Sequence, residues 1–100
     1  MKKIEIDVLS ETINCPVVQM PGRKYPGLVL QGDSLRILLN STQEICEMCA
    51  SEGNYELLDA ATSLKDKLTG YVAAYEQTLK EAGRELPYVK RLDAGSQAIP

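Results

Sequence analysis

The sequence predicts an α+β domain, in which an N-terminal β-hairpin or three-stranded antiparallel sheet packs on an antiparallel hairpin of two helices. Two changes along the chain predict this class. The N-terminal third holds short apolar segments separated by Pro and Gly, and the apolar residues then follow a helical period that a Gly-Asn pair interrupts once. We expect residues 1–92 to form one domain and residues 93–100, DAGSQAIP, to form a flexible tail.

The first strand is predicted by an alternation of apolar and charged residues over residues 3–9. Ile4, Ile6 and Val8 fall on one side of it, which indicates a half-buried strand. A turn over residues 10–14 leads to a second strand at 15–20. Its start is expected at a sheet edge, because Pro16 has no N–H to donate.

The apolar run at residues 28–30 suits a third strand with both faces covered, or the entry to a buried helix. A first helix is predicted from Leu35 for about seventeen residues, because apolar residues recur there at spacings of three and four. Asp33 or Ser34 supplies the N-cap oxygen. Gly53 is expected to end this helix.

A second helix is predicted from residue 55 to residue 82, with Asn54 as its N-cap and Gly83 at its end. The short connection makes the two helices antiparallel neighbours. The second helix is longer than the first, so its far end must be covered by the sheet, by residues 86–89 or by a second copy of the chain. Gly70 inside it predicts a kink or a close contact.

The loop at residues 21–27 contains two Pro and two Gly residues, which predicts a specified turn with Arg23, Lys24 and Tyr25 at its tip. These three residues are candidates for contact with a carboxylate or a phosphate. The alternative, which we favour, is that Tyr25 packs back on the domain and leaves only the charges exposed.

Two short motifs point to chemistry that the rest of the chain does not support. Residues 32–35 spell GDSL, a block typical of serine esterases, but the chain has no histidine to act as the base and is too short for their layered sheet. Residues 22–27 have the spacing of a phosphate-binding loop, but Leu28 and Val29 follow instead of a lysine and a hydroxyl. We therefore expect no enzymatic activity and no cofactor.

Residues 21–35 contain the sequences PGRKYPG and QGDSL. This segment resembles a small bacterial domain family of unknown function whose members have about this length. The resemblance rests on P-G-R-x-Y-P-G followed by Q-G-D-S-L. It implies a bacterial, soluble, single-domain protein with no established activity, and it carries over no catalytic residues.

The net charge of −3 argues against non-specific binding to nucleic acid, and no targeting or membrane-spanning pattern is evident, so we expect a cytoplasmic location. Three cysteines without a secretion signal favour free thiols. Cys46 and Cys49 have C-x-x-C spacing but fall on an apolar stripe well inside the first helix. We expect core cysteines there, rather than a redox pair or a zinc site.

Acidic residues cluster where the two predicted helices meet. No lysine or arginine occurs between Ile37 and Leu64, and this stretch contains five carboxylates: Glu44, Glu47, Glu52, Glu56 and Asp59. The cluster is either a solvated face that keeps the protein soluble or a docking surface for a basic partner.

The leading functional hypothesis is a small non-enzymatic protein-binding domain, most concretely an immunity-type antidote that binds a basic toxin through this acidic face. The alternative is a homo-oligomeric structural or regulatory protein, such as a homodimer, that assembles through residues 64–82 of its second helix. In that case, a polar substitution at Val72 or Leu79 should change the oligomeric state.

Overall fold

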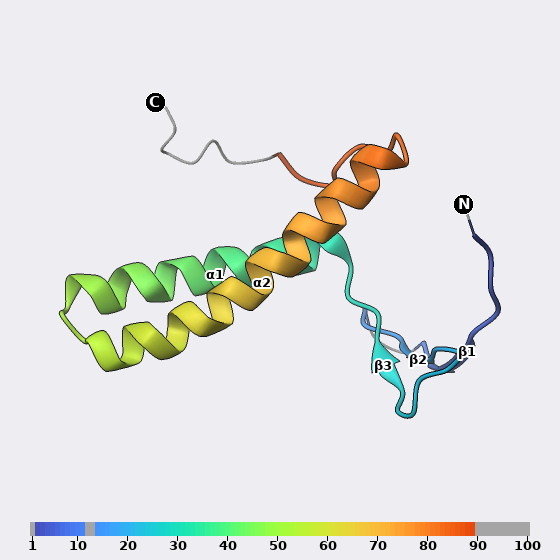
Figure 1. Cartoon of the computed structure of the whole chain (residues 1–100), viewed down its shortest axis with the longest axis horizontal. Coiled ribbons are helices and arrows are strands. Elements are labelled where there is room, and N and C mark those ends of the chain that lie inside the picture. Colours follow the sequence, from blue (N-terminus) through green and yellow to red (C-terminus); the bar gives the residue numbers. More distant parts are fainter. Residues whose placement is uncertain (1, 12–13, 90–100) are drawn as a thin grey trace.

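The fold is described by a computed structural model over residues 2–11 and 14–89, and it confirms the α+β class (Figure 1). Three strands precede two helices along the chain. They are β1 (Asp7–Ser10), β2 (Val17–Gln19), β3 (Gly27–Leu28), α1 (Gly32–Ser51) and α2 (Tyr55–Glu81). The expected tail at 93–100 lies outside the described residues.

The strands form a three-stranded antiparallel sheet in the order β1-β2-β3. Val8 pairs with Val18, which in turn pairs with Gly27, and a bulge follows Val8 in β1. The second strand is therefore central, and the expectation that it starts at an edge was wrong. Pro16 lies just outside this strand. Its carbonyl accepts a hydrogen bond from the Val29 N–H at 2.9 Å, and this contact needs no N–H from the proline.

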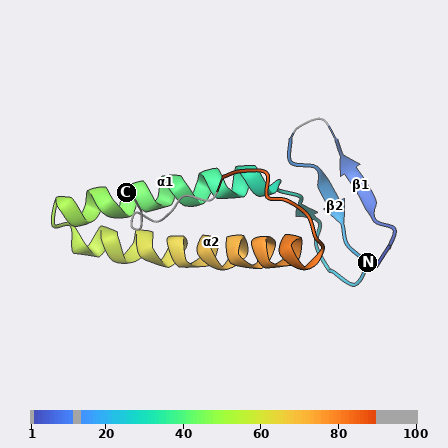
Figure 2. The same cartoon turned by 90° about the horizontal axis from the view of Figure 1, so that it is seen from above.

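The predicted packing of the sheet on the helices is not observed. Within residues 2–11 and 14–89, no strand contacts either helix, and the sheet lies beyond the open end of the helical hairpin (Figures 1 and 2). The three apolar residues expected on a half-buried side, Ile4, Ile6 and Val8, are all exposed. Leu28, in the run expected to be covered on both faces, is exposed as well. Alternation shows which side chains share a face, but it does not show what covers that face.

The first helix begins three residues earlier than predicted, at Gly32, and neither Asp33 nor Ser34 is its N-cap. The N-cap position is Gln31, whose side chain makes no capping hydrogen bond. Asp33 lies in the first turn instead, where its negative carboxylate interacts favourably with the positive end of the helix dipole. The early start also brings the backbone at Gly32 against the Tyr75 ring, which a Cβ at this position would overlap.

The turn between the helices is as predicted. The Asn54 side chain accepts a hydrogen bond from the Leu57 N–H at 3.2 Å and caps α2. Gly53 has a φ of +71° and its N–H binds the Ala50 carbonyl, while the Asn54 N–H binds the Cys49 carbonyl, which completes a Schellman motif. These bonds fix α1 and α2 as an antiparallel hairpin (Figure 2).

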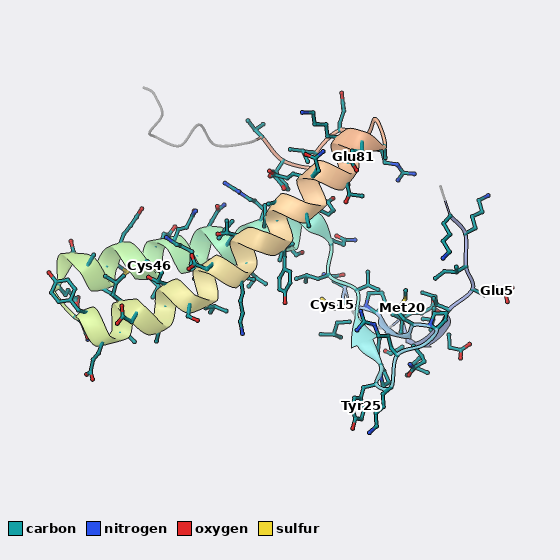
Figure 3. All side chains as sticks on the ribbon, in the orientation of Figure 1. Glu5, Cys15, Met20, Tyr25, Cys46 and Glu81 are labelled. Atoms are coloured by element: carbon teal, nitrogen blue, oxygen red, sulfur yellow. The ribbon has the colours of Figure 1, made fainter. Side chains whose placement is uncertain are left out.

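The core of the hairpin is a single layer between the two helices. Its buried side chains are Leu39, Thr42, Cys46, Cys49 and Val72. Figure 3 shows Cys46 between α1 and α2, and its Sγ lies 3.9 Å from Thr62 Oγ1. The placement of the two helical cysteines in the core is thus confirmed, and both are free thiols. No side chain of the described ranges is less than 2% exposed, because two helices alone cannot surround one.

Gly70 does not make the close contact expected of it. It is exposed on α2, and no atom beyond its chain neighbours and the nearby backbone of the helix lies within 4 Å of the position that a Cβ would take. We therefore expect Gly70→Ala to raise the free energy of unfolding by about 1 kcal/mol, because alanine restricts the unfolded chain and favours the helix. Urea denaturation followed by circular dichroism measures this change. A loss of stability would show that the glycine is needed for packing.

Candidate protein-interaction surfaces

The predicted acidic cluster is exposed throughout, but the structure divides it between the helices. Glu44, Glu47 and Glu52 line a shallow depression at the C-terminal end of α1, together with Met48 and Ser51. The other two members, Glu56 and Asp59, lie in the first turns of α2 and do not line it. Within the described ranges, none of the five carboxylates has a hydrogen-bond or ion-pair partner. Their charges are therefore directed at solvent.

The loop after β2 is a fixed turn, as predicted. The Arg23 N–H binds the Met20 carbonyl at 3.2 Å, and the Gln19 side-chain amide donates to the Arg23 carbonyl at 2.7 Å. The expectation that Tyr25 packs back on the domain was wrong, because its side chain is 71% exposed at the loop tip (Figure 3). Lys24 Nζ lies 5.3 Å from its ring centroid, within cation–π range. The helices do not reach this loop and offer the ring no surface.

Residues 84–89 return from the end of α2 and pack beside both helices. The Tyr88 hydroxyl donates to Glu76 Oε2 at 2.8 Å, and the Arg36 guanidinium lies 5.9 Å from the centroid of the same ring. Of the three covers considered for the far end of α2, this segment is the one observed. Sequence reasoning named the segment but missed the roles of Arg36 and Glu76, because no motif marks them.

The environment of Tyr88 shifts its titration. Burial and the hydrogen bond to Glu76 raise the pKa of Tyr88 from 10.0 to about 12. Because the folded-state pKa is raised, the resulting stabilisation is fully present below pH 10 and is lost as the pH rises through the folded value. We therefore expect Tyr88→Phe to remove the highest-pH step of phenolate absorbance at 295 nm. Loss of a step near pH 10 instead, with the highest-pH step kept, would contradict the contact with Glu76.

A larger surface lies along the helical hairpin, and we call it the apolar face. It consists of six exposed side chains: Leu38, Ile45 and Met48 in α1, and Leu57, Leu64 and Tyr71 in α2. Each of them lies one position before a buried or half-buried residue, as Leu38 precedes Leu39 and Tyr71 precedes Val72. One residue turns a helix by about 100°. All six are therefore displaced in the same rotational sense from the interface between the helices.

The six side chains consequently lie on one side of the hairpin. Two antiparallel neighbours are related by an approximate two-fold axis perpendicular to their common plane. This axis exchanges the helices but keeps each side of the plane in place. A residue one position before an interface residue therefore lies on the same side of the plane in both helices. Ile45, before Cys46, and Tyr71, before Val72, are examples.

The opposite side of the hairpin is polar. Its residues come one position after the buried or half-buried ones: Glu47 follows Cys46, Asp59 follows Leu58, and Asp66 follows Lys65. Two members of the predicted acidic cluster thus point away from the apolar face. The hairpin is amphipathic as a unit: the large apolar side chains are concentrated on one side, and the other side carries acidic residues together with small ones such as Ala73.

Sequence reasoning missed the apolar face by treating each helix as one stripe. By helical period alone, Leu57 and Leu64 fall on the same broad stripe as Val72, whereas in the structure the two leucines are exposed and Val72 is buried. Adjacent apolar pairs were the available signal, such as Leu38 with Leu39 and Leu57 with Leu58. Two neighbouring residues on a helix cannot both face one partner.

Two further properties of the described residues bear on function. Neither helix there contains a segment long and apolar enough to cross a lipid bilayer. Over residues 2–11 and 14–89, no three His, Cys, Asp or Glu side chains lie close enough together to hold a metal ion. Ser34 of the GDSL block is half-buried in the first turn of α1, and its backbone N–H binds the Asp33 carboxylate at 2.9 Å.

Comparison with known proteins gave one family and no individual relative. Neither the search of curated proteins nor the search of solved structures found a match. A family model, described as a family of unknown function, matches residues 1–88, which is most of the chain. The protein therefore belongs to the DUF6959 family, a family of unknown function.

Proposed function

We propose that this protein is a non-enzymatic protein-binding domain and that it binds through the apolar face of its helical hairpin. The observation that carries the proposal is the size of that face. Its six side chains are each about half exposed, for example Leu64 at 52%. At roughly 200 Å² for a fully exposed side chain of this kind, they leave on the order of 600 Å² of largely apolar surface in contact with water.

A patch of this size lies at the upper end of what a monomer exposes. The largest apolar patch of a typical monomer is roughly 300–600 Å² and is itself often a functional site. The surrounding chemistry supports binding over catalysis. The chain has no histidine, and the tyrosine with a raised pKa, Tyr88, stays protonated at neutral pH.

Photo-crosslinking from two positions of α2 tests this proposal. Leu64 and Asp66 flank the half-buried Lys65, so the first lies on the apolar face and the second on the polar side. We expect benzoylphenylalanine at position 64 to crosslink to a protein in a lysate of the native host, and the same group at position 66 not to do so. Equal labelling from both positions, or none from either, would contradict the proposal.

The immunity-type antidote is a second candidate, and the exposure of the acidic cluster favours it. Glu44, Glu47 and Glu52 lie around the exposed side chain of Met48, without a nearby cation between residues 37 and 64. Such a surface can steer a basic partner by long-range attraction and then bury an apolar anchor. In this case the acidic end of α1 makes the first contact and Met48 extends it onto the apolar face.

Charge reversal tests the acidic surface. The triple variant Glu44→Lys, Glu47→Lys and Glu52→Lys should weaken binding of a captured basic protein by about tenfold or more and remove its dependence on salt. The matched control is Glu85→Lys, an exposed reversal at the far end of the chain. Circular dichroism should show both variants folded. Unchanged affinity in the triple variant would exclude the acidic surface from the contact.

A further inference from the structure

We infer that a second copy of this chain covers the apolar face, so that two hairpins pack in opposite directions as a four-helix bundle. This inference rests on the proposed function, since it names the partner of the same surface. It follows from the symmetry of the face, from the area that it buries and from the distribution of charge along the hairpin.

The symmetry of the face suits pairing with itself. A two-fold symmetric dimer uses the same patch on both copies, so the patch must be complementary to its own image. The apolar face is built from two antiparallel helices, each contributing three large side chains. In α2 these side chains, Leu57, Leu64 and Tyr71, follow at intervals of seven residues. Intervals of seven are the spacing by which helices pack side by side in bundles.

The area of the face is sufficient for a dimer. Two copies that bury roughly 600 Å² each would remove about 1,200 Å² from water, at the lower end of the range of stable specific interfaces. None of the six side chains carries a charge. The desolvation of ions is therefore limited to the border of the face, where Glu44, Glu47 and Glu52 lie around Met48.

Charge decides the orientation of the second copy. The end of the hairpin at the α1–α2 turn carries Glu52 and Glu56 and has no lysine or arginine between residues 37 and 64. The open end carries both signs and is close to neutral, because Arg36, Lys80 and Arg84 occur there with Asp33, Glu76, Glu81 and Glu85. Two copies with their turns together would gather two acidic ends that hold no cation, whereas opposite orientation separates these ends and places each beside the partner's nearly neutral open end.

Analytical ultracentrifugation of the full chain between 1 and 200 µM (roughly 0.01–2 g/L) tests whether a second copy covers the apolar face. Tyr71 and Ala73 flank the buried Val72, so Tyr71→Glu alters the apolar face and Ala73→Glu alters the opposite side of the same helix. We expect the natural chain and Ala73→Glu to dimerise, and Tyr71→Glu to raise the dimer dissociation constant about 100-fold. Leu64→Gln should weaken the dimer as well. Circular dichroism should show that the Tyr71→Glu and Leu64→Gln variants remain helical.

A natural chain that stays monomeric at 200 µM, about 2 g/L, would overturn the inference, as would equal effects of Tyr71→Glu and Ala73→Glu. Different outcomes test the proposed function separately from the dimer. A monomer that crosslinks from position 64 to a different protein would leave the face as a binding surface and exclude the second copy. A monomer without crosslinks would exclude both.

Spin labels at the hairpin turn test the orientation. Glu52→Cys in a Cys15→Ser background places one label near each turn of the dimer, since the other two cysteines are buried. Opposite orientation, centred near Leu64, separates the two labels by about 30 Å, because each turn lies roughly ten residues along a helix from that point. Labels about 10 Å apart would show the turns together and overturn the proposed orientation.

Discussion

Replacing Val72 by aspartate is expected to unfold the helical hairpin. Val72 is 3% exposed in α2, and α1 is the element that packs on this helix. A carboxylate there would be buried without a partner, which costs about 4 kcal/mol or more, a large part of the stability of a domain this size. The helical signal in circular dichroism at 222 nm should be lost.

This result would revise the role that the sequence suggested for Val72. A polar residue at this position was expected to change the oligomeric state, but the structure assigns the side chain to contacts within one chain. Ala73→Asp is the control, because it places the same charge on the exposed side of the helix. A folded Val72→Asp protein with an altered oligomeric state would contradict the structure and restore the first interpretation.

Leu38 and Leu39 should respond very differently to the same substitution. Leu39 is 2% exposed between the helices, whereas its neighbour Leu38 is 47% exposed on the apolar face. Leu39→Ala should lower the free energy of unfolding by about 3 kcal/mol, through lost burial and the cavity left behind. Leu38→Ala should cost about 1 kcal/mol or less at a low protein concentration, where a dimer would be dissociated.

Urea denaturation of the two variants, measured at about 1 µM and about 100 µM, separates these effects. At the higher concentration, the effect of Leu38→Ala should grow if the apolar face is covered by a second copy. The effect of Leu39→Ala should change less. Equal losses for both leucines at the low concentration would contradict the assignment of Leu39 to the interior and Leu38 to the surface.

Local rules were sufficient to predict the order and type of the elements. Gly53 and Asn54 fix the turn through backbone and side-chain bonds within a few residues, and these bonds depend on little else in the chain. Gly83 ends α2 in the same way, with a φ of +69°. The period of apolar residues located both helices, because a helix that buries one side must repeat its apolar residues near every 3.6 positions.

The arrangement of the elements could not be predicted in this way. The alternation of Ile4, Ile6 and Val8 is that of an amphipathic strand, yet nothing in the described ranges covers these side chains. Periodicity shows which side chains share a face. Only the tertiary structure shows which other residues, if any, pack against that face. The start of α1 was misplaced for a related reason, since Gly32 meets Tyr75 from a helix 43 positions further along the chain.

The acidic residues show the same limit at the candidate site. Their sequence positions predicted one cluster, but Glu47 and Asp59 lie on the polar side of the hairpin, while Glu52 is the C-cap residue of α1 at the turn. The sequence could count the charges and could not assign them to a side. The pairs of adjacent apolar residues were the stronger signal, because they require two different partners for one helix.

Alkylation of a single introduced cysteine tests the central claim, that the apolar face is covered in the assembled protein. Leu64→Cys and Asp66→Cys place a thiol on the apolar face and on the polar side of the same turn. Peptide mass spectrometry then gives the rate at each site at about 1 µM and about 100 µM. We expect the thiol at position 64 to become several-fold slower at the higher concentration, and the thiol at position 66 to keep its rate. Equal rates at both sites and both concentrations would show an open face and contradict the claim.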